Sequence, residues 1–137
     1  TQKATDDKLN HAYFKSKGIK NAKKAPSGLY YVVHKPGAGL SPKNGQKVTV
    51  NYTGQNLQGE KFDSNVDPAF NHVEPFSFDL GKGGVIKGWD LGVALMKKGM
   101  KATFYLPSSL AYGERGAGEK IPANAILIFD IELLSFQ

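Results

Sequence analysis

The segment GVIKGWDLGVALM, residues 84–96, carries the helical pattern on which the predicted fold rests. Its apolar residues recur every three or four positions and so share one helix face: Ile86, Trp89, Val93 and Met96. Gly88 and Gly92 each cost a helix about 0.5–1 kcal/mol relative to alanine, and isolated helices this short are marginal in water. We therefore expect a short helix over 85–96 that packing holds in place, with Trp89 on its inner face.

Elsewhere the apolar residues follow the period of two that is typical of β-strands. Strands are predicted over residues 29–35, 46–55, 60–64, 75–81, 101–106 and 125–136. The last segment is nearly all apolar, which favours a central place in the sheet. The simplest architecture is α+β, with an antiparallel half-barrel sheet of five to six strands wrapped around one short α-helix. Trp89 then faces the concave side of the sheet.

The positive charge of the chain is concentrated near its start. Residues 1–25 hold seven lysines against Asp6 and Asp7, whereas residues 26–137 hold eleven basic and ten acidic residues. Nucleic-acid binding requires a basic stripe across the folded domain, so we favour a solvated lysine-rich lead-in and expect no nucleic-acid partner.

A short helix is predicted within this lead-in. Thr5 is a suitable cap, the two aspartates after it suit the positive end of a helix, and Gly18 is a suitable stop. The apolar residues expected on one face are Leu9, Ala12 and Tyr13. The segment NAKKAPSG, residues 21–28, indicates a linker. We therefore predict a basic N-terminal arm with a short helix over 1–26, followed by one folded domain over 27–137.

Several kinds of chemistry are excluded or disfavoured. The sequence has no cysteine, which rules out disulfides, zinc thiolate sites and thiol nucleophiles. The three histidines lack the spacing of metal ligands: His11, His34 and His72. The glycine-rich residues 81–88 have neither of the two glycine spacings typical of phosphate-binding loops, G-x-x-x-x-G-K-S/T and G-x-G-x-x-G. We expect no metal and no cofactor, and no apolar run approaches the ~18 residues that span a membrane.

The segment DSNVDPAFNHVE, residues 63–74, partly matches a calcium loop. Oxygen-bearing side chains occupy its first, third, fifth and twelfth positions: Asp63, Asn65, Asp67 and Glu74. The sixth position requires glycine, and here it is Pro68, whose ring forbids the sharp turn. We therefore predict a polar surface loop between strands.

Six ordered blocks of this chain resemble the FKBP family of peptidyl-prolyl cis–trans isomerases. They are VNYTG (50–54), FDS (62–64), PFSFDLGKGGVIKGWDLGVALMKKG (75–99), SLAYGERG (109–116), IPANA (121–125) and LIFDIELL (127–134). The blocks place the resemblance over about residues 27–134. The half-open sheet that this family folds around a short helix agrees with the architecture predicted above.

The resemblance implies an apolar pocket with Trp89 as its floor. It assigns catalysis to Asp63, Tyr112, Phe129, Trp89 and Ile86, the last through its backbone N–H. It assigns substrate binding to Tyr52, Phe62, Phe76, Val85 and Ile121. Composition alone favours the opposite interpretation, because aromatics in a half-barrel are more often core.

Two departures from the family pattern affect this pocket. The loop 64–74 contains no lysine or arginine that could pair with Asp63, and the loop 114–120 contains neither histidine nor proline. Since the second loop is expected to overhang the pocket, substrate preference and drug affinity are left open.

The resemblance implies a prolyl isomerase that assists protein folding without covalent chemistry. The expected partners are proline-containing peptides, unfolded clients and macrolides such as tacrolimus and rapamycin. One alternative is a binding or chaperone module with little turnover, and another is a basic adaptor that acts through residues 1–25. A monomer is expected because the arm is short beside the dimerisation helices of some exported relatives. A lysine-rich tether favours the bacterial envelope, with the cytoplasm as the alternative.

Overall fold

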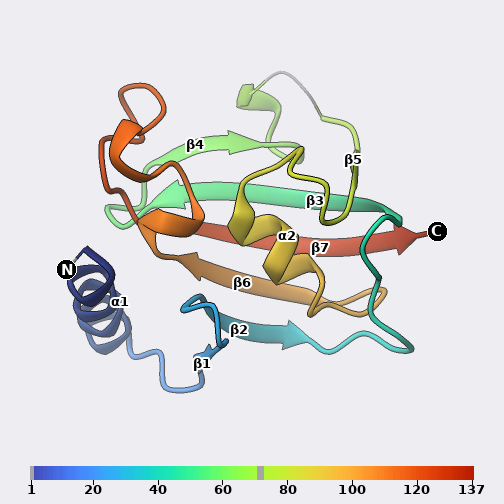
Figure 1. Cartoon of the computed structure of the whole chain (residues 1–137), viewed down its shortest axis with the longest axis horizontal. Helices are drawn as coiled ribbons and strands as arrows, with labels where there is room; N and C mark the ends of the chain where they lie inside the picture. The colour runs from blue at the N-terminus through green and yellow to red at the C-terminus, as the bar shows by residue number, and fades with distance from the viewer. Residues whose placement is uncertain (1, 71–72) are drawn as a thin grey trace.

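The computed structural model describes residues 2–70 and 73–137, so His72 lies outside the described residues. Two α-helices and seven strands occur in this part of the chain (Figure 1). The helices are α1 (Gln2–Lys17) and α2 (Lys87–Val93). The strands are β1 (Lys23–Lys24), β2 (Tyr30–Lys35), β3 (Lys47–Asn56), β4 (Lys61–Ser64), β5 (Phe76–Asp79), β6 (Lys101–Leu106) and β7 (Leu127–Phe136). Over the same residues, no helix is long and apolar enough to cross a membrane.

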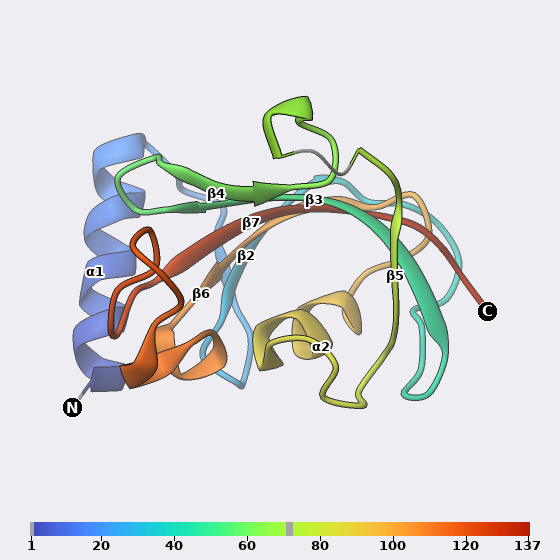
Figure 2. The same cartoon turned by 90° about the horizontal axis from the view of Figure 1, so that it is seen from above.

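All strand pairings are antiparallel, and the strands form one sheet in the order β1-β2-β6-β7-β3-β4. Strand β5 lies off this path and pairs with β3. The sheet curls over α2, which lies on its concave side (Figure 2). The predicted α+β half-barrel is confirmed, and the predicted central strand, β7, lies between β6 and β3. Strand β1 was not predicted from the sequence, because its residues lie in the segment 21–28 that was predicted as a linker.

Helix α2 lies tightly against β6 because two of its positions are glycine. A Cβ atom on Gly88 would stand 2.4 Å from Cδ1 of Leu106, and one on Gly92 would stand 3.0 Å from Cε1 of Phe104. A side chain at Gly88 would require the buried Leu106 or the helix to shift, whereas one at Gly92 would require the Phe104 ring to give by a few tenths of an ångström. The helix is shorter than the predicted 85–96, since it begins after Ile86, which is extended, and the chain leaves it at Ala94.

The main core fills the space between α2 and the concave face of the sheet. Its fully buried members include Leu29, Val48, Val50, Leu80, Val93, Met96, Leu106, Leu127 and Leu133. They come from α2, β3, β6 and β7, and from positions just before β2 (Leu29), just after β5 (Leu80) and after α2 (Met96). Met96 keeps its predicted inward position although it lies beyond the end of the helix.

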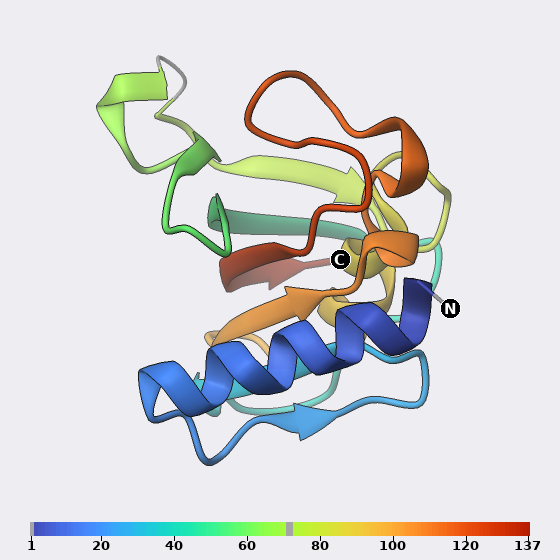
Figure 3. The same ribbon diagram turned by 90° about the vertical axis from the view of Figure 1, so that its left-hand side faces the viewer.

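Helix α1 packs against the opposite face of the sheet, at the side of the molecule shown in Figure 3. A second cluster of buried residues joins Phe14 of α1 to the convex face: Tyr30, Val32, Tyr105 and Ile128. The expectation of a solvated lead-in is therefore wrong for this helix. The division of the chain at residue 26 stays a prediction.

The predicted face of this helix is wrong for two of its three residues, since only Tyr13 is partly buried against this second cluster. Leu9 is 45% exposed and Ala12 is exposed, whereas the buried stripe is Asp6, Asn10 and Phe14 at four-residue spacing. Thr5 lies inside the helix rather than at its cap, because α1 already includes Gln2. Two of the three stripe residues are polar, so apolar periodicity could not reveal this face.

Candidate active site

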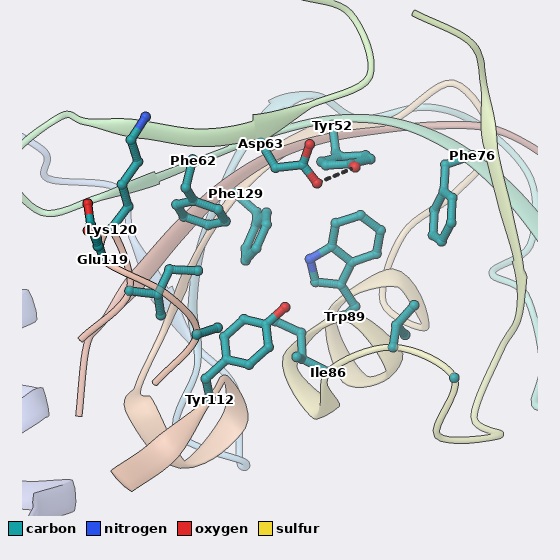
Figure 4. Close-up of a pocket in the computed structure, with 14 residues that line it drawn as sticks. Tyr52, Phe62, Asp63, Phe76, Ile86, Trp89, Tyr112, Glu119, Lys120 and Phe129 are labelled. Carbon is teal, nitrogen blue, oxygen red and sulfur yellow. Dashed lines mark hydrogen bonds between the residues drawn. The ribbon is translucent and has the colours of Figure 1, made fainter. Parts of the chain in front are cut away.

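A pocket of about 690 Å³ opens on the concave side of the sheet, beside the N-terminal end of α2 (Figure 4). All ten residues implied by the resemblance line it: Tyr52, Phe62, Asp63, Phe76, Val85, Ile86, Trp89, Tyr112, Ile121 and Phe129. They come from β3, β4, β5, β7 and α2, and from the loops before α2 and before β7. The fold thus brings together residues as distant in the chain as Tyr52 and Phe129.

The floor of the pocket is Trp89, whose side chain is surrounded by other aromatic rings. Its indole meets the rings of Tyr52, Phe129 and Phe76 edge to face, with centroids 4.8, 5.3 and 5.9 Å away. Such edge contacts are favourable beyond the area they bury. Only 5% of Trp89 is exposed, so the neighbouring rings fix its orientation and leave a limited surface for a ligand.

One wall depends on a glycine of β3. The rings of Phe62 and Phe129 meet edge to face at 5.5 Å. A Cβ atom on Gly54 would lie 2.6 Å from the first ring and 2.7 Å from the second. The absence of a side chain at Gly54 is therefore what allows these two rings to approach the strand.

The polar side of the pocket contains a hydrogen-bonded pair. Tyr52 Oη donates to Asp63 Oδ2 at 2.7 Å, and Oδ1 of the same carboxylate accepts from the N–H of Ser64 at 2.8 Å. Burial, followed by the Asp63 carboxylate, raises the pKa of Tyr52 far above its usual value. The tyrosine therefore stays protonated as a donor, which supplies Asp63 with a partner although the sequence of the loop 64–74 contains no lysine or arginine.

The strand and loop around this pair are fixed by Asn65, which is 2% exposed. Its Oδ1 accepts from the N–H of Tyr52 at 2.7 Å, while Nδ2 donates to the carbonyls of Val50 and Glu74 at 2.9 and 3.0 Å. Asn65 therefore works as a loop anchor inside the segment that resembled a calcium loop.

Two further residues with hydrogen-bond donors, Tyr112 and Ile86, line the pocket on the other side. Tyr112 follows a 3₁₀-turn, η2 (Ser108–Leu110); it is 41% exposed, and its hydroxyl points into the pocket (Figure 4). Ile86 precedes the first turn of α2 in an extended conformation, so its N–H stands outside the helical hydrogen-bond ladder. The approach to Ile86 is held by Asp90, whose carboxylate accepts from the N–H groups of Gly81 and Gly83 at 2.8 and 3.2 Å.

Four lining residues were not singled out from the sequence: Gly84, Ala117, Glu119 and Lys120. The last three belong to the loop 114–120, which the sequence analysis expected over the pocket. Lys120 Nζ donates to the carbonyl of Lys61 at 3.2 Å, so this loop is tied to β4 across the pocket rim. Asp90 and Gly54 were missed as supporting residues, although Gly54 closes one of the quoted sequence blocks.

Comparison with known proteins adds independent findings. Residues 39–134 match the family model described as FKBP-type peptidyl-prolyl cis-trans isomerase. The chain is similar to FkpA of Aeromonas hydrophila, described as an FKBP-type peptidyl-prolyl cis-trans isomerase, with 50% identity over 90% of this chain and 42% of that protein. It is similar to the peptidyl-prolyl cis-trans isomerase Fkbp12 of Drosophila melanogaster, with 48% identity over 80% of this chain and 99% of that protein.

A similar fold is found in a solved structure. The crystal structure of FkpA from Escherichia coli superimposes with a TM-score of 0.78 at 38% identity, covering 98% of this chain and 61% of that one. The chain spans less than half the length of several curated relatives, including 28% of FK506-binding protein 4 of Rhizopus delemar.

Proposed function

The chain belongs to the FKBP-type peptidyl-prolyl cis–trans isomerase family, and we propose that its aromatic pocket catalyses rotation about X–Pro peptide bonds. The observation that carries the proposal is the joint placement of the ten implied residues around one cavity with a tryptophan floor. The activity assists folding, because slow X–Pro isomerisation is a rate-limiting step for many chains.

The reaction requires no bond to be broken and no proton to leave. Rotation about an amide interrupts C–N resonance, a barrier of about 18–20 kcal/mol, whereas the two X–Pro isomers differ by only about 0.5–1 kcal/mol. The planar amide is more dipolar than the twisted one, so an apolar, water-poor pocket disfavours the ground state relative to the transition state. A thousandfold acceleration needs only about 4 kcal/mol.

The prolyl ring is proposed to sit on Trp89, between Phe76 and Phe129. These rings offer flat apolar surfaces on three sides of the cavity. With the ring held, the carbonyl before proline rotates, and the N–H of Ile86 and the hydroxyl of Tyr112 are the donors placed to engage substrate carbonyls. Both groups stay fixed while the amide turns, which is the condition for stabilising a transition state by pre-placed dipoles.

We propose that the Asp63 carboxylate acts on the rotating amide through its electrostatic field and does not accept a proton from the substrate. This carboxylate is held by Tyr52 Oη and by the N–H of Ser64, so its position is set before substrate arrives. The high pKa of Tyr52 keeps that hydroxyl a donor throughout the physiological range.

The proposed substrates are proline-containing segments of unfolded proteins, with tacrolimus- and rapamycin-type macrolides as competitors for the same pocket. Glu119 and Lys120 at the rim place one charge of each sign where residues flanking the proline pass. We propose that the catalytic pocket belongs to the domain of residues 27–137, that the chain acts as a monomer, and that it needs neither a metal nor an organic cofactor.

The competing function is a module that holds proline-containing segments without turning them over. NMR exchange spectroscopy on an Ala-Leu-Pro-Phe peptide separates the two. An isomerase makes the cis and trans signals exchange at a rate proportional to the protein added. Saturable shifts of the peptide signals with unchanged exchange would support the binding module instead.

A further inference from the structure

We propose that Asp6 of α1 is a positioning residue for Tyr112, acting through Ser108. Asp6 lies outside residues 39–134, the part of the chain that matches the family model. The expected loss of kcat/KM rests on the proposed function, whereas the expected change in the position of Tyr112 does not.

The contact is a buried carboxylate with three donors. Asp6 is 1% exposed, and its Oδ2 accepts from both the backbone N–H and the hydroxyl of Ser108, at 2.8 and 2.6 Å. Its Oδ1 accepts from Nε2 of Gln2 at 2.7 Å. Ser108 is also 1% exposed. Hydrogen bonds to an ionised acceptor are about twice as strong as neutral ones, so this contact ties two segments that are 102 residues apart in sequence.

Ser108 is the first residue of η2, at the root of the pocket loop. Pro107 precedes it, and no side chain within the turn caps it. The Asp6 carboxylate takes the place of that cap by accepting the N–H of Ser108. The N–H of Ala111 then bonds back to the carbonyl of Ser108 at 3.0 Å, and Tyr112 follows directly. The position of Ser108 therefore determines the position of the Tyr112 backbone.

Gly113, the residue after Tyr112, accepts at its carbonyl from the N–H of Asn124 at 2.8 Å, whereas Tyr112 itself is 41% exposed at the pocket rim. Its carbonyl accepts from the N–H of Gly116 at 3.3 Å, a long bond within the same loop. The direction of its hydroxyl therefore depends on a short backbone segment that is anchored at Ser108 on one side and at Gly113 on the other. Weakening the Asp6 contact releases the anchor at Ser108 without changing any pocket residue chemically, so Tyr112 is the pocket side chain expected to move.

The neighbouring carboxylate provides a matched control. Asp7 also ties α1 to the sheet, but it accepts from Tyr30 Oη at 2.7 Å and pairs with Lys24 Nζ at 3.3 Å, and neither residue lines the pocket. Asp7→Asn and Asp6→Asn make the same chemical change one residue apart on one helix. Both weaken the docking of α1, whereas only Asp6→Asn disturbs η2.

The kinetic test uses the full chain and a double-mutant cycle with Tyr112→Phe, which removes only the hydroxyl. We expect Asp6→Asn to lower kcat/KM about tenfold when Tyr112 is present and less than about twofold when it is phenylalanine. Asp7→Asn is expected to lower Tm and leave kcat/KM within about twofold. Equal losses from Asp6→Asn in both backgrounds, or the same loss from Asp7→Asn, would overturn the proposal.

A second measurement does not depend on catalysis. In protein labelled with 3-fluorotyrosine, the ¹⁹F signal of Tyr112 is assigned by its disappearance in Tyr112→Phe. We expect Asp6→Asn to shift or broaden this signal and Asp7→Asn to leave it unchanged. If Asp6→Asn does not fold, Ser108→Ala is measured in its place, because it removes the hydroxyl donor of Ser108 to Asp6 and keeps the backbone N–H donor. If the ¹⁹F signal of Tyr112 does not change in Asp6→Asn, the positioning role of Asp6 is rejected. If the signal changes but the wild type shows no isomerase activity, only the proposed function is rejected.

Discussion

The Tyr52–Asp63 pair is the residue-level feature that distinguishes this pocket from a plain apolar core. A core of this size would gain nothing from a carboxylate, because burying one requires hydrogen-bonded partners. Here the partner is a tyrosine on the neighbouring strand, at 2.7 Å. The pair places a fixed negative charge at the edge of an aromatic cavity, which is an arrangement suited to a dipolar ligand.

The first prediction concerns this pair. Tyr52→Phe removes one donor to Asp63 and keeps the ring against Trp89, so kcat/KM is expected to fall about 5- to 20-fold. The free energy of unfolding is expected to fall by about 1–3 kcal/mol, since the partly buried carboxylate loses a hydrogen bond. Isomerase kinetics and urea unfolding measure the two effects.

The control for this prediction is Tyr30→Phe, which also breaks a tyrosine–carboxylate bond of 2.7 Å, to Asp7 on the convex side. It is expected to lower stability without a comparable loss of kcat/KM. If both variants lose activity equally, the loss reflects general destabilisation and the role given to Asp63 is wrong.

At the scale of elements, the pocket exists because α2 lies closer to β6 than any side chain at Gly88 would allow. Gly88→Ala would place a Cβ atom 2.4 Å from Leu106. We expect it to destabilise the protein by about 1–3 kcal/mol through overpacking and to lower kcat/KM, because the shift of α2 displaces Trp89. Urea unfolding and isomerase kinetics measure the change.

A compensating substitution sharpens this test. Leu106→Ala alone is expected to cost about 2–5 kcal/mol as a cavity, but it removes the atoms that the new methyl group of Gly88→Ala would strike. The double variant should therefore be more stable than the sum of the two single losses implies. Gly84→Ala is the control for stability, because its Cβ would meet nothing within 4 Å. Strictly additive losses would contradict the close-packing explanation.

The elements that sequence reasoning predicted correctly are those with an apolar period. The strands β2 to β7 and the helix around Trp89 were found because packing and periodicity agree in them. The docking of α1 was missed because Asp6 and Asn10 occupy its buried face, and a polar stripe has no hydrophobic signature. Their burial depends on Ser108 and the convex face, contacts that no local pattern encodes.

The residues of the site also divide into those that the sequence could predict and those that it could not. The ten implied residues could be named because a family motif carries them, and composition alone favoured the core interpretation. The contributions of Ala117, Glu119 and Lys120 depend on how one loop crosses the rim, and that course is set by long-range contacts such as the bond from Lys120 to the carbonyl of Lys61.

At the scale of the whole molecule, α1 and the sheet are joined by a second core that contains titratable groups. Burial raises the pKa of Tyr105 to about 12, with smaller contributions from Tyr13 and Asp130. Tyr105 ionises near pH 10 when the chain is unfolded. The raised value therefore contributes stability that is complete below about pH 10 and is lost as the pH rises through about 12.

This linkage gives a prediction for alkaline stability. Between about pH 10 and 12, one such tyrosine lowers the free energy of unfolding by about 1.4 kcal/mol per pH unit. Tyr105→Phe keeps the ring but not the titration, so its stability should fall less steeply over this range while matching the wild type near pH 8. Urea unfolding at pH 8, 10 and 11 measures the slopes, and parallel slopes would show that Tyr105 is not protected by the docked helix.

The central claim is that catalysis occurs on the aromatic surface formed by Trp89 and Phe129. The most direct test is the exchange rate of a prolyl peptide, measured by NMR, with Phe129→Leu and with Phe104→Leu. The two phenylalanines are cross-strand partners on β6 and β7, both nearly fully buried, but only Phe129 lines the pocket. We predict that Phe129→Leu lowers kcat/KM at least about tenfold and Phe104→Leu less than about threefold. Equal effects on exchange from the two variants would contradict the account.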